Sequence, residues 1–207
     1  MAMRCLAGFA LAGLVLGAVP VWGQEGGGAG YRGEFWDTGP LHSIDEALAW
    51  IDGHDPTGTF VSTLIDYPNG EADDAPDATD IRSFLGVDGT SYAGTAPQDL
   101  SGSVFRISGT IRPGPGLRTY RVWSDDGFAL FFDGREVSRN TYERTIGSTD
   151  VTRDAGDGTV DFVLVYFENG GVTGVEFTLN GAMIDKRIAA GPPEGADGER
   201  RVLLRRP

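Results

Sequence analysis

The stretch VWSDDGFALFFDG, residues 122–134, places two adjacent aspartates between apolar segments that alternate in the manner of β-strands. It ends in Asp133 and Gly134, a dipeptide that is a strong signal for a tight β-hairpin turn. The stretch therefore predicts a strand on each side of Asp125 and Asp126 and a hairpin after the second strand.

The same alternation continues on both sides of this stretch, from Val104 nearly to the end of the chain. A second hairpin dipeptide, Asn180–Gly181, lies between two such runs. Many short strands with little helix favour an all-β fold, an antiparallel β-sandwich or barrel. The alternation also predicts which side chains form the core: Leu130, Phe132, Phe162, Leu164 and Tyr166.

The region before Val104 is more mixed. YRGEFW, residues 31–36, predicts a first strand, and residues 44–52 predict a short helix with Ser43 and Glu46 in capping-box spacing. One further helical turn is expected near residues 80–86. The acidic segment NGEADDAPDATD, residues 69–80, is expected to be a loop. Its carboxylates are either a calcium-binding group or simply a solvated charge run.

The first residues of the chain predict export. Residues 1–23 have an early positive charge, a short apolar core and a small-residue ending, the pattern of a secretory signal peptide. The only cysteine lies within them, so we expect no disulfide in the mature protein. We expect one β domain over residues 30–186, a disordered basic tail over residues 187–207, no integral membrane segment in the mature chain, and a secreted or periplasmic location.

Charge and missing motifs narrow the function. The chain carries a net charge of −13, which disfavours nucleic acid as a partner and leaves multivalent cations and neutral ligands. His42 and His54 lack the spacing of a zinc site, and neither a GxSxG motif nor a phosphate-binding loop is present. We therefore expect a protein that is not an enzyme.

The aspartate pair has two physical explanations. Successive side chains of a regular strand point to opposite faces, so Asp125 and Asp126 in such a strand cannot grip one ion together. Either Ser-Asp-Asp-Gly is an ordinary tight turn, or the peptide bond between the aspartates is cis and both carboxylates face one hard-cation site.

The segments GLRTYRVWSDDGFALFFDGREV and VDFVLVYFENGG together resemble the protective-antigen domain family. Members share the Ser-Asp-Asp-Gly corner, an apolar strand that ends in Asp-Gly, and a later strand that closes in Glu-x-Gly-Gly. The resemblance covers about residues 30–185. It implies a compact antiparallel β-sandwich or barrel, often a carbohydrate-binding module of exported proteins.

In the lectin-like members, similar to the yeast flocculation adhesins, a consecutive aspartate pair binds calcium with an asparagine and carbonyls of a second loop. The resemblance implies that Asp125, Asp126 and Asn169 bind calcium here, with carbonyls near Gly171 and Thr173 as further ligands. Calcium takes six to eight oxygens, so neighbouring sugar hydroxyls can complete its shell. The adhesins' disulfides have no counterpart in this chain.

Two aromatic residues flank the aspartates: Trp123 and Phe128 either stack on a sugar ring or belong to the core. The leading hypothesis is an exported, calcium-dependent, lectin-like module that binds glycans or polysaccharide. The alternative is a structural or protein-interaction domain of the cell envelope with no metal site. A glycan-cleaving enzyme is the weakest hypothesis, because the chain has no room for a separate catalytic domain.

Overall fold

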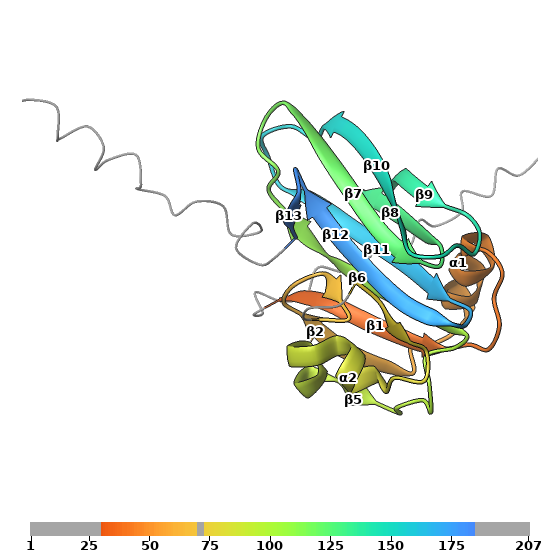
Figure 1. Ribbon diagram of the computed structural model, residues 1–207. Coiled ribbons are helices and arrows are strands. Elements are labelled where there is room, and N and C mark those ends of the chain that lie inside the picture. Colours follow the sequence, from red (N-terminus) through yellow and green to blue (C-terminus); the bar gives the residue numbers. More distant parts are fainter. Residues whose placement is uncertain (1–29, 70–72, 185–207) are drawn as a thin grey trace, which may run out of the picture.

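The computed structural model describes residues 30–69 and 73–184 of the chain. In these residues two antiparallel β-sheets pack face to face, as Figure 1 shows, so the predicted all-β sandwich is confirmed. The predicted signal peptide and basic tail lie outside the described residues, and the domain boundaries remain predictions. No helix of the described part is both long and apolar enough to cross a membrane.

The first sheet has seven strands in the order β5-β2-β1-β6-β11-β8-β9. Its centre consists of the long strands β1, β6 and β11, and the pairs β1–β6, β6–β11 and β11–β8 are all antiparallel. The predicted first strand is confirmed as β1. The strands are β1 (Tyr31–Asp37), β2 (Gly58–Ser62), β5 (Ala93–Gly94), β6 (Ser103–Ile111), β8 (Phe128–Phe132), β9 (Arg135–Asn140) and β11 (Val160–Glu168).

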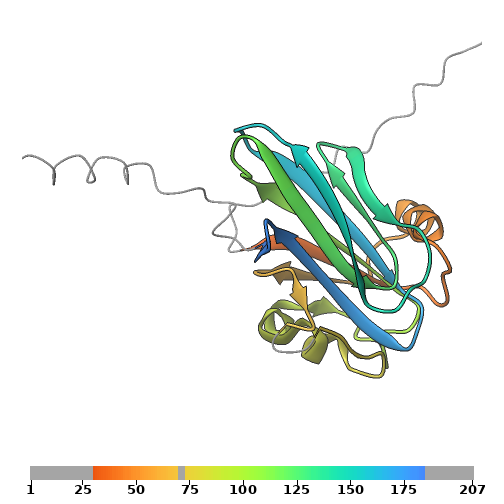
Figure 2. The ribbon, with the colours of Figure 1, turned by 45° about the horizontal axis from the view of Figure 1, so that its top comes forward.

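The second sheet has the order β10-β7-β12-β13, and two short strands, β3 and β4, also pair with β12. Figure 2 shows β7 and β12 running side by side across the face of the sandwich. These strands are β3 (Asp66–Tyr67), β4 (Ala75–Pro76), β7 (Leu117–Asp125), β10 (Gly147–Asp154), β12 (Val172–Leu179) and β13 (Ala182–Met183).

Both predicted hairpins are present, and their backbone angles explain the residue types. The β8–β9 turn has Asp133 at φ 48° and Gly134 at φ 73°. The β12–β13 turn has Asn180 at φ 50° and Gly181 at φ 81°. Two consecutive left-handed residues form the turn whose twist matches a hairpin, and asparagine, aspartate and glycine tolerate that conformation best.

Three short helical segments accompany the sheets: α1 (Ile44–Gly53), α2 (Ile81–Leu85) and the 3-10 helix η1 (Gly86–Ser91). The predicted helix near residues 44–52 is α1, the longest of them. Ser43 Oγ accepts from the Glu46 backbone N–H at 3.3 Å. The Glu46 carboxylate accepts from the backbone N–H of His42 at 2.8 Å, so the reciprocal half of the capping box falls one residue earlier than the motif predicts.

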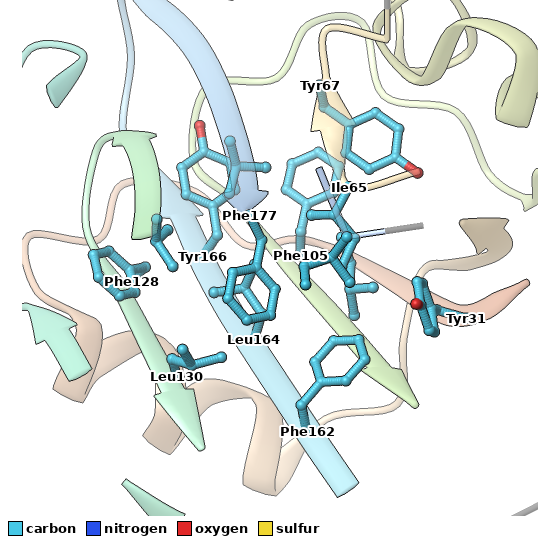
Figure 3. Close-up of a cluster of buried hydrophobic side chains, with 14 of the residues drawn as sticks. Tyr31, Ile65, Tyr67, Phe105, Phe128, Leu130, Phe162, Leu164, Tyr166 and Phe177 are labelled. Carbon is cyan, nitrogen blue, oxygen red and sulfur yellow. The ribbon is translucent and has the colours of Figure 1, made fainter. Parts of the chain in front are cut away.

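The main core lies between the two sheets, and Figure 3 shows side chains from both gathered there. Phe162 of β11 lies 5.8 Å from Phe177 of β12, and Tyr120 of β7 lies 4.8 Å from Phe132 of β8, between ring centroids. All five predicted core residues, Leu130, Phe132, Phe162, Leu164 and Tyr166, are buried.

A second apolar cluster lies on the outer face of the seven-stranded sheet, beneath α1. Ile44 and Ala47 of α1 are fully buried there with Val104, Val165 and Phe167 of the central strands. Both faces of β6 and β11 are therefore covered by packed side chains. The end of β11 carries part of the site described next.

Candidate metal centre

The two aspartates of the opening stretch lie at the corner between β7 and β8. The peptide bond between Asp125 and Asp126 is cis, as in the second of the two arrangements that the sequence allows. Both side chains are buried, at 4% and 5% exposure. Together with Glu168, which ends β11 and is fully buried, they place one carboxylate oxygen each within 4.8 Å of one another.

Tyr166 connects the cluster to the core. Its hydroxyl contacts the backbone carbonyl of Asp125 and lies 2.9 Å from Glu168 Oε2. The same hydroxyl accepts from the backbone N–H of Gly174 on β12 at 3.3 Å. The tyrosine therefore links three strands, β7, β11 and β12, directly beneath the acidic cluster.

Two loops supply backbone donors to Asp126. Its Oδ1 accepts from the backbone N–H of Arg144 at 3.0 Å, and its Oδ2 accepts from that of Asn169 at 2.9 Å. The first loop joins β9 to β10 and the second joins β11 to β12. The Asp126 carboxylate therefore connects both loops to the corner between β7 and β8.

Asn169 is half-buried, and a hydrogen bond to Glu143 orients its side-chain amide. Nδ2 donates to Glu143 Oε1 at 2.7 Å, whereas Oδ1 is buried with no hydrogen-bond partner among the described residues. The ring nitrogen Nδ1 of His42 lies 2.6 Å from the same Glu143 oxygen, and this hydrogen bond raises the pKa of His42. The amide oxygen of Asn169 thus remains available.

Several buried oxygens around the cluster lack a hydrogen-bond partner within the described part of the chain. They are Asp125 Oδ2, Glu168 Oε1, Asn169 Oδ1 and Thr173 Oγ1. A buried polar atom without a partner costs free energy, so the partnerless oxygens of Asp125 and Glu168, which both belong to the cluster, indicate a missing ligand. The backbone carbonyl of Gly171, implied as a ligand by the family resemblance, already accepts from the N–H of Asp77 at 3.1 Å.

One guanidinium group lies near the cluster but does not pair with its carboxylates. Arg144 donates from Nε to the Ser124 carbonyl at 3.1 Å and from a terminal nitrogen to Ser124 Oγ at 2.8 Å. Its charge favours ionisation of Asp125, yet burial is the larger influence on both groups. The protein's own cation therefore balances the cluster only in part.

Burial and mutual repulsion both act on the acidic cluster. Burial, followed by the charge of Asp126, raises the pKa of Asp125 to about 6. The same two causes raise the pKa of Glu168 to about 9, and burial raises the pKa of Asp126. Three carboxyl groups so close cannot all ionise at neutral pH without a compensating cation.

The donor set fits a hard divalent cation. Asp125, Asp126, Glu168 and Asn169 offer only oxygen atoms, the ligands that calcium prefers. The described residues hold one group of acidic, histidine or cysteine side chains arranged this closely, and it is this one. Calcium accepts irregular shells of this kind, whereas magnesium demands near-ideal octahedral geometry.

The two flanking aromatic residues are placed differently from each other. Phe128 is fully buried in the core between the sheets, so its ring has no face for a sugar (Figure 3). The stacking alternative is therefore wrong for Phe128, because β8 turns its first side chain inward. Trp123 is half-buried on the outer face of the second sheet, and the Arg121 guanidinium lies 5.8 Å from its ring centroid.

Three residues of the site escaped the sequence analysis. Glu168 was part of the quoted ENGG motif, and a charge that ends an apolar strand was the available signal. Glu143 had no signal, because its role depends on the contact with Asn169. Tyr142, 69% exposed, precedes the two loop residues that bond to the site, and its exposure is visible only in the fold.

No protein-family model and no curated protein matches the chain. Solved structures match its fold. One is the PA14 domain of MpAFP, an antifreeze protein, with 21% sequence identity, a TM-score of 0.66, and coverage of 76% of this chain and 86% of that one. Another is a PA14 sugar-binding domain from an RTX adhesin, with 23% identity, a TM-score of 0.64, and coverage of 76% and 94%.

These likenesses confirm, at the level of the fold, the resemblance drawn from the aspartate corner and the ENGG loop. The chain has the fold of a PA14 domain, named for the protective antigen. The comparison covers most of each matched domain.

Proposed function

We propose that this chain is an exported, calcium-dependent, lectin-like module that binds glycans without cleaving them. The observation that carries the proposal is the buried cluster of Asp125, Asp126 and Glu168, with unpartnered oxygens at the loop end of the sandwich. Buried carboxylates at this density need a cation, and a loop end is where a sandwich fold exposes a binding surface.

Asp125, Asp126, Glu168 and Asn169 are the residues that would hold the ion. A bound calcium would supply coordination positions for neighbouring sugar hydroxyls, because it takes six to eight oxygens. Two backbone donors fix the Asp126 carboxylate, and Glu143 turns the Asn169 oxygen away from itself. The protein part of the site is thus arranged before any ligand arrives.

Several features support a neutral glycan as the ligand. The net charge of −13 repels phosphate backbones but has little effect on an uncharged sugar. Tyr142 has an exposed ring and lies in the same loop as Arg144, whose N–H binds Asp126, and aromatic rings are suited to packing on the apolar face of a sugar. The matched domain of the RTX adhesin is described as sugar-binding. The N-terminal pattern of a signal peptide supports export.

The test is retention of the protein on an array of neutral glycans, measured with calcium and with a chelator. We expect binding to at least one glycan class in calcium, loss of it in chelator, and loss of it in Asp126→Asn. Asp157→Asn removes the same charge from an exposed turn and serves as the matched control.

Two results would overturn the proposal. Glycan binding that persists in chelator would remove calcium from the mechanism. If calcium has no effect and no glycan is retained, the structural or protein-interaction module of the cell envelope becomes the better explanation. Circular dichroism of Asp126→Asn distinguishes loss of the site from loss of the fold.

A further inference from the structure

A pocket of about 500 Å³ lies on the outer face of the seven-stranded sheet, at the C-terminal end of α1. Strands β1 and β6 form its floor, and the end of α1 with the segment that follows forms its wall. Arg106, on the floor, lies three residues along β6 from Ser103, the cross-strand partner of Glu168. Arg106 is therefore about 10 Å from Ser103 and on the opposite face of the sheet, so the pocket is separate from the acidic cluster.

The floor of the pocket carries a buried ion pair with an excess of positive charge. Glu34 of β1 and Arg106 of β6 are cross-strand partners, and Arg106 Nε lies 2.5 Å from Glu34 Oε2. Arg32 donates to the other carboxylate oxygen of Glu34 at 2.9 Å. Glu34 is 2% exposed, whereas the Arg32 side chain is 56% exposed. Two guanidinium groups against one carboxylate leave one positive charge, which Arg32 presents to a ligand.

Trp36 fixes the wall of the pocket to the floor. Its ring nitrogen Nε1 donates to the backbone carbonyl of His54 at 2.9 Å, and the Arg106 guanidinium lies 5.0 Å from its ring centroid. The His54 ring in turn stacks on Trp50, with 4.1 Å between the ring centroids. These contacts hold both sides of the pocket in place, so a ligand that binds there needs to order few side chains.

The wall carries charge of the opposite sign. Asp52 and Asp55 line the pocket and are exposed. Neither carboxylate makes a hydrogen bond or an ion pair within residues 30–69 and 73–184. The last turn of α1 has no basic residue, so the carbonyl groups at this helix end add partial negative charge. A pocket with a positive floor and a negative wall favours a ligand that carries both charges.

We propose that this pocket binds short peptides in their zwitterionic form. The terminal carboxylate of the peptide pairs with Arg32, because a guanidinium group presents parallel donors that match a carboxylate. The terminal ammonium group lies against Asp52 and Asp55. An extended peptide advances about 3.3 Å per residue, so two or three residues separate the end charges by about 7 to 10 Å. A pocket of about 500 Å³ accommodates a ligand of this length.

The two charged sides select against other small ligands. A simple anion meets the like charges of Asp52 and Asp55, and a simple cation meets those of Arg32 and Arg106. A neutral sugar forms an ion pair with neither side. The peptide site therefore differs in chemistry from the proposed glycan site, and it depends neither on calcium nor on glycan binding.

Isothermal titration with four forms of one tripeptide tests the proposal. The forms are trialanine, trialanine amide, N-acetyl-trialanine and N-acetyl-trialanine amide. The titrations are made at pH 7 in a chelator, so that calcium does not contribute. We expect trialanine to bind, each singly blocked form to bind about tenfold more weakly because it loses one ion pair, and the doubly blocked form to show no binding.

Two variants assign each end of the peptide to one side of the pocket. In Arg32→Gln, trialanine and its amide should bind equally, because the carboxylate has lost its partner. In the double variant Asp52→Asn, Asp55→Asn, trialanine and its N-acetyl form should bind equally. All three replaced side chains are exposed, so these variants should fold as the wild type does, which circular dichroism checks. The matched controls remove the same charges from exposed positions elsewhere and should bind as the wild type does: Arg135→Gln and Asp157→Asn.

Three results would overturn the proposal. The first is a wild-type protein that does not bind trialanine, and the second is equal affinity for all four forms. The third is peptide binding that neither pocket variant alters, which would place the peptide elsewhere. Asp126→Asn separates this site from the calcium site: we expect it to bind trialanine as the wild type does, and loss of peptide binding in it would refute a separate pocket.

Discussion

The Asn169 side chain donates from Nδ2 to Glu143 Oε1 at 2.7 Å, and its Oδ1 atom is left buried without a partner. Rotating the amide by half a turn would place its oxygen against a carboxylate, which repels it. Glu143 therefore acts as a positioning residue for a candidate metal ligand. This relationship joins loops 26 residues apart in the chain.

Glu143→Ala should weaken calcium binding about tenfold, because loss of an outer partner that orients a ligand has effects of this size. The measurement is isothermal titration with calcium, on the component that Asp126→Asn abolishes. Glu136→Ala is the control, since Glu136 pairs with Arg139 elsewhere on the surface. Equal calcium affinity in Glu143→Ala and wild type would show that Asn169 needs no such support.

Tyr142→Ala should reduce glycan affinity about tenfold, equivalent to ~1.4 kcal/mol, while leaving calcium affinity unchanged. The exposed ring contributes contact area to a ligand but no ligand to the ion. Leu117→Ala is a matched control, because Leu117 is 70% exposed at the opposite end of β7. If both variants retain glycans equally well, Tyr142 does not face the bound sugar.

Phe128→Ala should destabilise the fold by about 3 to 5 kcal/mol, because it leaves a cavity in the core between the sheets. Urea unfolding followed by tryptophan fluorescence measures the loss. A variant that keeps nearly all its stability but no longer binds glycans would contradict the assignment of Phe128 to the core.

Asp80→Ala should cost about 1 kcal/mol of stability at pH 7, because Asp80 caps α2 by accepting from the N–H groups of Arg82 and Ser83. A hydrogen bond from the Ser83 hydroxyl is the main cause that lowers the pKa of Asp80 in the folded state. A depressed pKa stabilises the fold above the unfolded value near 3.9, and that stabilisation disappears as pH falls through the folded value.

The difference in unfolding free energy between wild type and Asp80→Ala should therefore shrink between about pH 5 and pH 2. Urea unfolding at several pH values measures this difference. A gap that grows on acidification would mean that the cap does not depend on the charge.

Much of the fold followed from local pattern. Alternation placed Leu130, Phe132 and Phe162 in the core because side chains of a strand point to opposite faces. Asp133–Gly134 and Asn180–Gly181 marked hairpins because few residues accept left-handed angles. The inward direction of Phe128 could not be read, because it begins β8 directly after the corner where the alternation is interrupted.

For the candidate site, too, local sequence pattern predicted one part and long-range contacts decided the other. The sequence by itself determined the all-β sandwich, its hairpins and the acidic corner at Asp125 and Asp126, because strand periodicity and turn preferences act between near neighbours in the chain. Only the tertiary structure decided that Glu168 joins the pair, that Glu143 orients Asn169, and that Asp66 lies opposite Glu176 on the neighbouring strand. These contacts join segments far apart in the chain, and their distances depend on how the sheets and loops pack rather than on any local preference.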